Sequence, residues 1–408
     1  MQVYELLEAL VKALSNEAIA LRHDLLESVL LASQPFWREM PFRVERPQWV
    51  NDYPDLDDAL QRMPAERLGA LLDDNRALVE WLGDRVAVPG YGADLLDVPA
   101  LPRETVGSSL RSAWGVPGRK RAQIEAFAAA TASLKDPVLE WCAGKGHLGR
   151  LFSLTHGVSV TSLEIDAELC RAGEALASRA GASTQAFVVA DAFSRDAAKL
   201  VSGRHVMALH ACGDLHRDLV VAATTQGSAG LAVSPCCYYR LREARYQPFC
   251  TSSRLELSRD DLHLAVTETV TAPGRGVRER DRAAQWKLAF VAWRETQTAA
   301  GYQTFKPVPS AWLSQPFAEF ISRLCEREGF ASPPSRALAD LLQQGERRFE
   351  LMMRRSVVRL AFRRLLELWL VCDLAEPLIS HGFDVSLGVF CDRKLTPRNL
   401  MLRATAPA

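Results

Sequence analysis

The sequence contains no run of about 18 uncharged apolar residues, so no membrane-spanning helix is expected. Its most apolar long stretch, residues 357–379, is interrupted by six charged side chains. Residues 1–5 place no basic group ahead of an apolar stretch and do not resemble a secretion signal. Nine cysteines in 408 residues are too few and too irregularly spaced for a disulfide scaffold. We therefore expect reduced thiols and a cytoplasmic protein.

Net charge is also absent, because 49 Lys and Arg residues balance 49 Asp and Glu residues. The two signs are unevenly distributed: residues 1–100 contain 9 basic and 18 acidic side chains, a net charge of −9, and the remainder carries +9. An acidic region repels nucleic acid, so we expect residues 1–100 to pack on the rest of the fold, to form a lid or to contact a protein partner.

The spacing of apolar residues divides the chain into four regions. Residues 1–100 are predicted to be helical, beginning with a helix over residues 1–33. Pro and Gly are frequent over residues 89–118, which marks a boundary. In residues 119–240 short apolar runs alternate with helical stretches, which predicts an α/β fold with a parallel sheet. The expected strands are 137–141, 158–164, 186–190, 206–210 and 231–234.

The last two regions differ in texture from the predicted sheet. Residues 241–355 predict an Arg-rich helical insertion. Residues 356–408 contain the end of a long predicted helix, 346–376, which Pro377 is expected to stop. Two strand-like runs, 384–390 and 399–404, then close the chain.

A glycine-rich loop follows the first predicted strand. Gly144, Gly146 and Gly149 match the pattern G-x-G-x-x-G, and Glu164 lies 20 residues after Gly144. This is the spacing of a dinucleotide site, in which glycines let the backbone approach the cofactor and the carboxylate accepts from ribose hydroxyls. An oxidoreductase that uses NAD or a flavin is therefore one hypothesis.

Acidic residues at the ends of the first three strands favour S-adenosylmethionine (SAM) instead. A pyrophosphate would be repelled by Glu140, whereas a sulfonium and an ammonium group attract it. Glu164 and Asp191 end the next two strands, where ligands of parallel sheets bind. We predict that Glu140 faces the methionine moiety, Glu164 the ribose and Asp191 the adenine. The predicted cofactor-binding residues are Glu140, Cys142, Gly144, Gly146, Glu164, Asp191 and Ala192.

Candidate substrate residues follow the fourth and fifth predicted strands. The loop after the fourth strand of a SAM-binding sheet normally faces the methyl group, and here it contains His210 and Asp214. An imidazole can act as a general base near neutral pH, or it can be a buried group bonded to backbone. We predict that His210, Asp214 and Tyr238 contact the substrate.

Three sequence blocks resemble one methyltransferase-domain family. They are Leu209-His-Ala-Cys-Gly, Pro235-Cys-Cys-Tyr and Leu395-Thr-Pro-Arg-Asn-Leu400. The family includes the ribosomal-RNA-adenine-dimethylase-domain-containing proteins and the methyltransferase domain of the glutathione-S-transferase-C-terminal-domain-containing protein. A tRNA ribose methyltransferase family is more distantly similar.

The resemblance covers residues 119–240 and 356–405. It implies a Rossmann-like sheet of the SAM-dependent methyltransferases with a C-terminal antiparallel hairpin. Cys142 stands where many SAM enzymes have the first glycine of the loop. The motif Asn/Asp-Pro-Pro-aromatic, which holds the amine of adenine in amino methyltransferases, is absent after the fourth strand. The resemblance therefore implies a cofactor more firmly than a substrate.

The cysteines at these strand ends allow three interpretations. Pro235-Cys236 resembles the nucleophilic thiolate of 5-methylcytosine enzymes. His210, Cys212, Cys236 and Cys237 converge and are candidate zinc ligands, although adjacent cysteines chelate poorly and C-x₂-C is absent. The third interpretation, small hydrophobic side chains packed below the substrate pocket, is the one we expect. No residue is therefore assigned to a metal.

Arginine makes up 17 of the 19 basic residues in 241–360. Helical spacing places Arg348, Arg355 and Arg359 on one face, where their guanidinium groups are suited to binding phosphate. Bases could stack on the interleaved aromatic residues Trp286, Trp293, Phe305 and Trp312. Surface ion pairs and a buried aromatic core are the alternative. RNA is the substrate class that we expect first; a protein side chain, a small molecule, or a non-catalytic SAM-binding scaffold are the alternatives.

Overall fold

The computed structural model describes residues 15–105, 107, 111–131, 134, 137–268, 274–299 and 301–407. The chain divides into two compact units. One contains Met1–Leu31, Gly90–Thr267 and Arg363–Ala408, and the other contains Ala32–Pro89 and Glu268–Phe362. No helix in the described ranges has the length and apolar character required to span a bilayer.

The first unit is built on a seven-stranded sheet with the order β3-β2-β1-β4-β5-β7-β6. The strands are β1 (Val138–Trp141), β2 (Val160–Glu164), β3 (Gln185–Val189), β4 (His205–Cys212), β5 (Gly230–Cys236), β6 (Asp384–Val389) and β7 (Leu400–Thr405). Strands β1 to β5 are parallel, and β7 pairs antiparallel with both β5 and β6. The α/β class, the parallel sheet and the C-terminal hairpin predicted from the sequence are confirmed.

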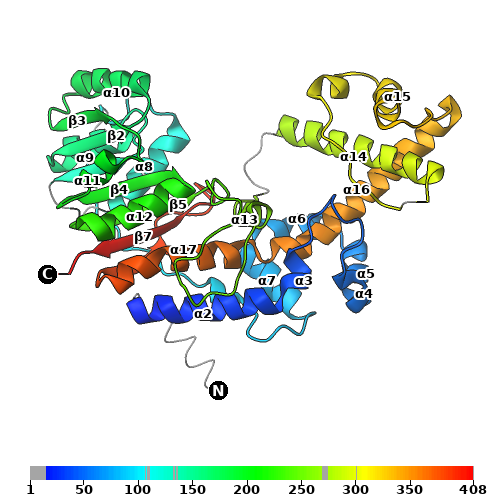
Figure 1. Cartoon of the computed structure of the whole chain (residues 1–408), viewed down its shortest axis with the longest axis horizontal. Coiled ribbons are helices and arrows are strands. Elements are labelled where there is room, and N and C mark those ends of the chain that lie inside the picture. Colours follow the sequence, from blue (N-terminus) through cyan, green and yellow to red (C-terminus); the bar gives the residue numbers. More distant parts are fainter. Residues whose placement is uncertain are drawn as a thin grey trace. The chain divides into compact units, whose positions relative to one another are not determined.

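Helices cover both faces of this sheet (Figure 1). The chain steps from β1 outward to β3 and then from β4 to β5 in the other direction, so right-handed crossovers place the two sets of helices on opposite faces. Phe127, Phe152, Met207 and Phe390 belong to the core on one face. Among the described residues, the helices of the first unit are α2 (Asn16–Ala32), α8 (Gly118–Ala130), α9 (His147–His156), α10 (Ala167–Ala180), α11 (Arg195–Lys199), α12 (Asp214–Gln226), α13 (Arg259–Ala265), α17 (Arg363–Ser380) and the 3-10 turn η1 (Ala93–Leu96).

The second unit is helical. Its longest helices, α14 and α16, pack closely at Gly345, where a Cβ atom would lie 2.3 Å from the carbonyl oxygen of Gln285. The elements are α3 (Gln34–Trp37), α4 (Trp49–Asp52), α5 (Pro54–Arg62), α6 (Ala65–Asp73), α7 (Asn75–Gly83), α14 (Gly274–Gln297), α15 (Phe317–Glu328), α16 (Leu338–Leu360) and the 3-10 turns η2 (Ser310–Ser314) and η3 (Ser335–Ala337).

Some predicted boundaries differ from the structure. The helix predicted over residues 1–33 is present as α2, and residues 1–14 lie outside the described ranges. The single helix predicted over 346–376 is two helices, α16 and α17, with the break at residues 361–362, where the two units meet along the chain. Pro377 lies inside α17, which ends three residues later at Ser380. The predicted region 1–100 is divided between the units.

The arginines of α16 are held inside the second unit. Arg355 donates to both carboxylate oxygens of Asp57 at 2.8 Å, and both side chains are buried. Arg359 donates to the Trp37 carbonyl at 2.8 Å, and Arg348 pairs with Glu295 and Glu45. The aromatic residues named for base stacking, Trp286, Trp293, Phe305 and Trp312, belong to or pack on a hydrophobic core with Phe290 and Phe320. These arginines and rings therefore stabilise the fold, and the alternative of ion pairs and an aromatic core is correct for them.

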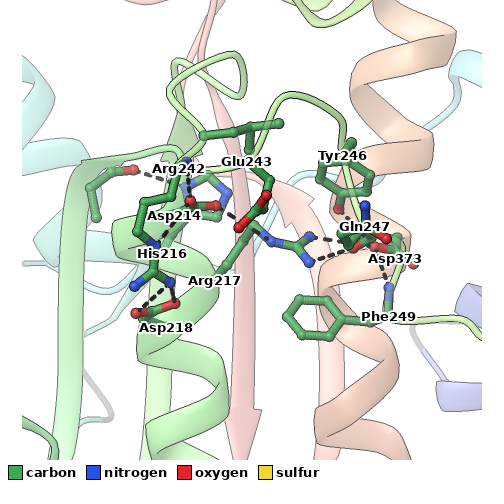
Figure 2. A network of polar contacts seen from close by, with 12 residues as sticks. Asp214, His216, Arg217, Asp218, Arg242, Glu243, Tyr246, Gln247, Phe249 and Asp373 are labelled. Carbon is green, nitrogen blue, oxygen red and sulfur yellow. Dashed lines mark hydrogen bonds and ion pairs between the residues drawn. The ribbon is translucent and has the colours of Figure 1, made fainter. Parts of the chain in front are cut away.

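A buried carboxylate explains why residues 241–258 fold with the sheet. Asp373 in α17 is fully buried and accepts hydrogen bonds from the Tyr246 hydroxyl at 2.7 Å and from the Phe249 and Cys250 backbone at 3.1 and 2.9 Å. Arg217 in α12 lies 3.8 Å from the same carboxylate (Figure 2). One side chain thus ties α12, α17 and the segment after β5 together.

We expect the substitution Asp373→Asn to lower the free energy of unfolding by about 2 kcal/mol, because an amide cannot accept all of these bonds and leaves buried donors unpaired. The matched control is Asp218→Asn in α12, whose carboxylate pairs with the exposed Arg242 and should cost less than about 0.5 kcal/mol. Urea unfolding of the three proteins measures both values. Equal losses in the two variants would contradict the role given to Asp373.

Candidate functional site

The glycine loop joins β1 to α9 through backbone conformations that favour glycine. Gly144 and Gly146 have φ of 59° and 60°, in the left-handed region. A Cβ on Gly146 would lie 2.5 Å from both the Gln185 amide nitrogen and the Phe187 ring. A Cβ on Gly149, in the first turn of α9, would lie 2.6 Å from a Glu140 carboxylate oxygen. Gly146 and Gly149 therefore let the loop and the helix approach the strands closely, and Gly144 permits the left-handed backbone of the loop.

Glu140 belongs to β1, and its side chain is only 4% exposed. Its carboxylate lies next to Gly149 in the first turn of α9. The Ser162 hydroxyl donates to its carboxylate at 2.7 Å. Burial raises the pKa of Glu140 to about 7, against the opposing effects of the Ser162 bond and the Gly149 and Leu148 backbone N–H groups. The predicted contact between Glu140 and a methionine moiety stays a prediction, and the structure shows a carboxylate that also supports the loop from below.

Glu164 ends β2 and fixes the other side of the loop. Its carboxylate accepts from the backbone N–H of Gly144 at 2.8 Å and from those of Ile165 and Asp166 at 2.9 and 3.1 Å. Asp191, after β3, accepts from the Phe193 backbone at 2.9 Å. The structure therefore brings three predicted residues, Gly144, Glu164 and Asp191, to one edge of the sheet.

A cavity of about 360 Å³ opens at this edge. Its lining residues are Cys142, Leu163, Glu164, Ile165, Ala190, Asp191, Ala192, Phe193 and Leu215. Ile165 and Phe193 are 63% and 42% exposed, although both are large and apolar. Apolar walls with carboxylates at the rim suit a flat heterocycle joined to a sugar. Sequence reasoning missed the apolar lining residues Leu163, Ile165, Ala190, Phe193 and Leu215. The available signal was a large apolar residue close behind two strand-end carboxylates: Ile165 directly follows Glu164, and Phe193 lies two residues after Asp191.

His210 lies where strand β4 is irregular. Its φ is 66°, and the register between β4 and β5 shifts between Leu209 and Cys212. The ring Nε2 lies 3.2 Å from the Gln123 side-chain oxygen in α8. Burial lowers the pKa of His210 below its ordinary value of 6.5, so the ring is neutral at pH 7. A neutral imidazole at the carboxyl end of β4 can accept a proton.

Asp214 and Tyr238 occupy different surroundings from His210. Asp214 is 9% exposed and accepts from the Arg242 backbone at 2.6 Å, so its carboxylate holds the turn after β5 (Figure 2). Tyr238 is 2% exposed and packs edge-on against His216. Burial also raises the pKa of Tyr238 above its ordinary value. Both side chains also pack within the fold, and the substrate contacts predicted for Asp214 and Tyr238 stay predictions.

The cysteines after β4 and β5 form one group. The sulfur atoms of Cys212, Cys236 and Cys237 all lie within 4.8 Å of one another. Hydrogen bonds with Cys212 and Cys237, together with burial, raise the pKa of the Cys236 thiol. Burial likewise raises the pKa of Cys142 to about 12. A nucleophilic thiolate is therefore disfavoured at Cys236, which weakens the comparison with 5-methylcytosine enzymes.

The class of this domain follows from its fold and from a family match. A family model described as a methyltransferase domain matches residues 119–244. This range runs from α8 to just past β5 and contains the glycine loop, the strand-end carboxylates and His210. With the sheet order and the C-terminal hairpin, it defines a Rossmann-like, SAM-dependent methyltransferase domain, for which SAM is the cofactor. Of the two interpretations of the glycine loop, the SAM site is the one supported.

Individual proteins are only weakly similar to the chain. EvdMO1 shares 25% identity over 28% of this chain and 27% of its own, with a TM-score of 0.24. The glycopeptide N-methyltransferase MtfA in complex with SAM shares 19% sequence identity over 33% of this chain and 63% of its own, with a TM-score of 0.24. The geranyl diphosphate C-methyltransferase from Streptomyces coelicolor A3(2) shares 12% sequence identity over 43% of this chain and 64% of its own, with a TM-score of 0.24.

The chain thus spans about a quarter of EvdMO1 and less than two thirds of the other two structures. Similarities at this TM-score carry no argument about the substrate. In a search of curated proteins, nothing matches the sequence.

Proposed function

We propose that this chain is an enzyme that transfers the methyl group of SAM to RNA, as a relative of the ribosomal-RNA-adenine-dimethylase-domain-containing proteins. The observation that carries the choice of RNA is a group of cations near the carboxyl ends of β4 and β5, where Lys120 acts on His210 and Arg240 acts on Cys212 and Cys237. Lys120, in the first turn of α8, and Arg240, after β5, are both exposed. Positive charges beside a methyl-transfer site favour a substrate that bears phosphate.

The influence of these cations reaches the site itself. The charge of Lys120 contributes to lowering the pKa of His210 after burial, and Arg398 contributes in the same direction. The positive charge of the Arg240 guanidinium likewise acts to lower the pKa of the Cys212 and Cys237 thiols. Since the arginines of α16 pair within their own unit, we assign the phosphate contacts to Lys120 and Arg240 in place of the Arg-rich insertion.

The chemistry requires positioning and one proton acceptor. SAM supplies an electrophilic methyl group on a sulfonium. The carboxylates of Glu164 and Asp191, with Ile165 and Phe193, are the residues that would hold the nucleoside part of SAM in the cavity. His210, neutral at pH 7, takes the proton that the acceptor atom of the substrate releases. Placing the acceptor in line with the methyl group lowers the barrier by roughly several kcal/mol.

Reversing the charge of the two cations tests this proposal. We expect Lys120→Glu and Arg240→Glu each to raise the KM for RNA about tenfold and to weaken its dependence on salt, with SAM affinity unchanged. Arg278→Glu, an exposed arginine of α14 in the second unit, is the matched control. Methyl transfer to total RNA is measured at two salt concentrations. An equal effect of all three substitutions would remove phosphate recognition from this edge of the sheet.

A further inference from the structure

We propose that Cys212, Cys236 and Cys237 bind a zinc ion at the carboxyl ends of β4 and β5. Their sulfur atoms already lie within 4.8 Å of one another, and those of Cys212 and Cys236 are 3.3 Å apart. Zinc bound tetrahedrally at about 2.3 Å from each sulfur sets the sulfurs about 3.8 Å from one another. Small side-chain adjustments therefore bring the three sulfurs to bonding distance.

The backbone removes the objection that adjacent cysteines chelate poorly. Side chains at successive positions of an extended strand point to opposite faces. Cys236 is the last residue of β5, and Cys237 has a φ of 45°, in the left-handed region. This conformation interrupts the alternation and brings the Cys237 sulfur to the side of Cys236. The two neighbours can then bind one ion.

Strand β4 delivers the third sulfur through a second irregularity. The pairing with β5 is regular up to Leu209, and it resumes with Cys212 opposite Cys236 after a shift of register. His210, inside this shift, has a φ of 66°. The bulge therefore places Cys212 directly beside Cys236, and bulges of this kind often occur at functional sites.

Backbone strain concentrates at this position. Among the described residues, four that are not glycine have positive φ: Phe42, Cys142, His210 and Cys237. Three of the four lie at the ends of the neighbouring strands β1, β4 and β5. Such a conformation is strained for a residue with a Cβ atom and persists where the surrounding structure requires it. The convergence of the three thiols provides a reason for the positive φ of His210 and of Cys237.

The donor set selects the class of metal. Thiolates suit zinc, and calcium or magnesium would require oxygen ligands. No fourth His, Cys, Asp or Glu joins the group in the part of the chain that the structure describes. Three protein ligands leave one coordination position for water or a substrate atom, as in catalytic zinc sites. Cys212 and Cys237 are half-buried, so that position is accessible from solvent.

Metal analysis of the full chain tests the site. Reduced wild-type protein, loaded with zinc and desalted, is expected to retain about one zinc ion. Cys212→Ser and Cys237→Ser should each lose it. Cys250→Ser, which removes a half-buried cysteine outside the group, should keep it. Retention of no zinc by the wild type, or an equal loss in Cys250→Ser, would overturn the proposal.

Cobalt substitution in the wild type gives a result that does not depend on the folding of any variant. A bound cobalt ion with three thiolate ligands is expected to show a thiolate-to-cobalt charge-transfer band and the visible bands of tetrahedral coordination. Absence of the charge-transfer band, or a disulfide between Cys212 and Cys236 in the freshly reduced protein, would contradict the site. The zinc site does not depend on which substrate receives the methyl group, so the two proposals fail separately.

Discussion

Replacing Glu164 with alanine is expected to weaken SAM binding about 100-fold or more. A carboxylate at the end of β2 can accept two hydrogen bonds from ribose hydroxyls, each worth about 1.5–3 kcal/mol for a charged acceptor. The same carboxylate accepts the Gly144 N–H at 2.8 Å, so its loss also loosens the glycine loop. Titration calorimetry with SAM measures the change.

Glu168→Ala is the matched control for this measurement. Glu168 lies in the first turn of α10, is exposed and pairs with Arg171, so its removal changes the local charge by the same amount without touching the cavity. Its SAM affinity should stay within about twofold of the wild type. Unchanged affinity in Glu164→Ala would remove Glu164 from the cofactor site.

The second large effect is a pH dependence of stability caused by Glu140. Burial raises its pKa in the folded protein from 4.5 to about 7. Between these values the folded state binds more protons than the unfolded state, so the contribution of Glu140 is fully present below pH 4.5 and is lost as the pH rises through 7. The loss amounts to about 3 kcal/mol of unfolding free energy.

Glu140→Gln removes this titration. Relative to the wild type, the variant is therefore expected to gain about 3 kcal/mol of stability between pH 4.5 and pH 8, measured by urea unfolding without SAM. Glu168→Gln, on an exposed side chain, should show no such change with pH. A stability difference between Glu140→Gln and the wild type that stays constant over this range would show that folding does not raise the pKa of Glu140.

The sequence was sufficient to predict the sheet and to bring Gly144, Glu164 and Asp191 to one edge of it. The strands β1 to β5 are short apolar runs between helical stretches, and Gly144, Glu164 and Asp191 follow directly from their spacing. Both signals are local, because the apolar pattern of a strand and the glycine spacing of a loop depend on residues that are close together in the sequence. The family match over residues 119–244 confirms the class that this pattern predicted.

Tertiary pairing explains what the sequence did not predict. Arg355 was assigned to a phosphate-binding face from its helical spacing. Its partner Asp57 lies 298 positions away in the sequence, so no local pattern predicts this ion pair. The edge-on packing of Tyr238 against His216 is another tertiary contact that the sequence does not show. The turn of Cys237 toward Cys236 depends on a positive φ, which a cysteine gives no reason to expect.

Methyl transfer from radiolabelled SAM to a cell extract, followed by separate digestion with nuclease and protease, tests the central claim most directly. We expect the label to be released by ribonuclease, to survive protease, and to be absent when Glu164→Ala replaces the wild type. Label released only by protease would contradict an RNA substrate. Binding of SAM without transfer to any component of the extract would contradict the enzyme and indicate a SAM-binding scaffold.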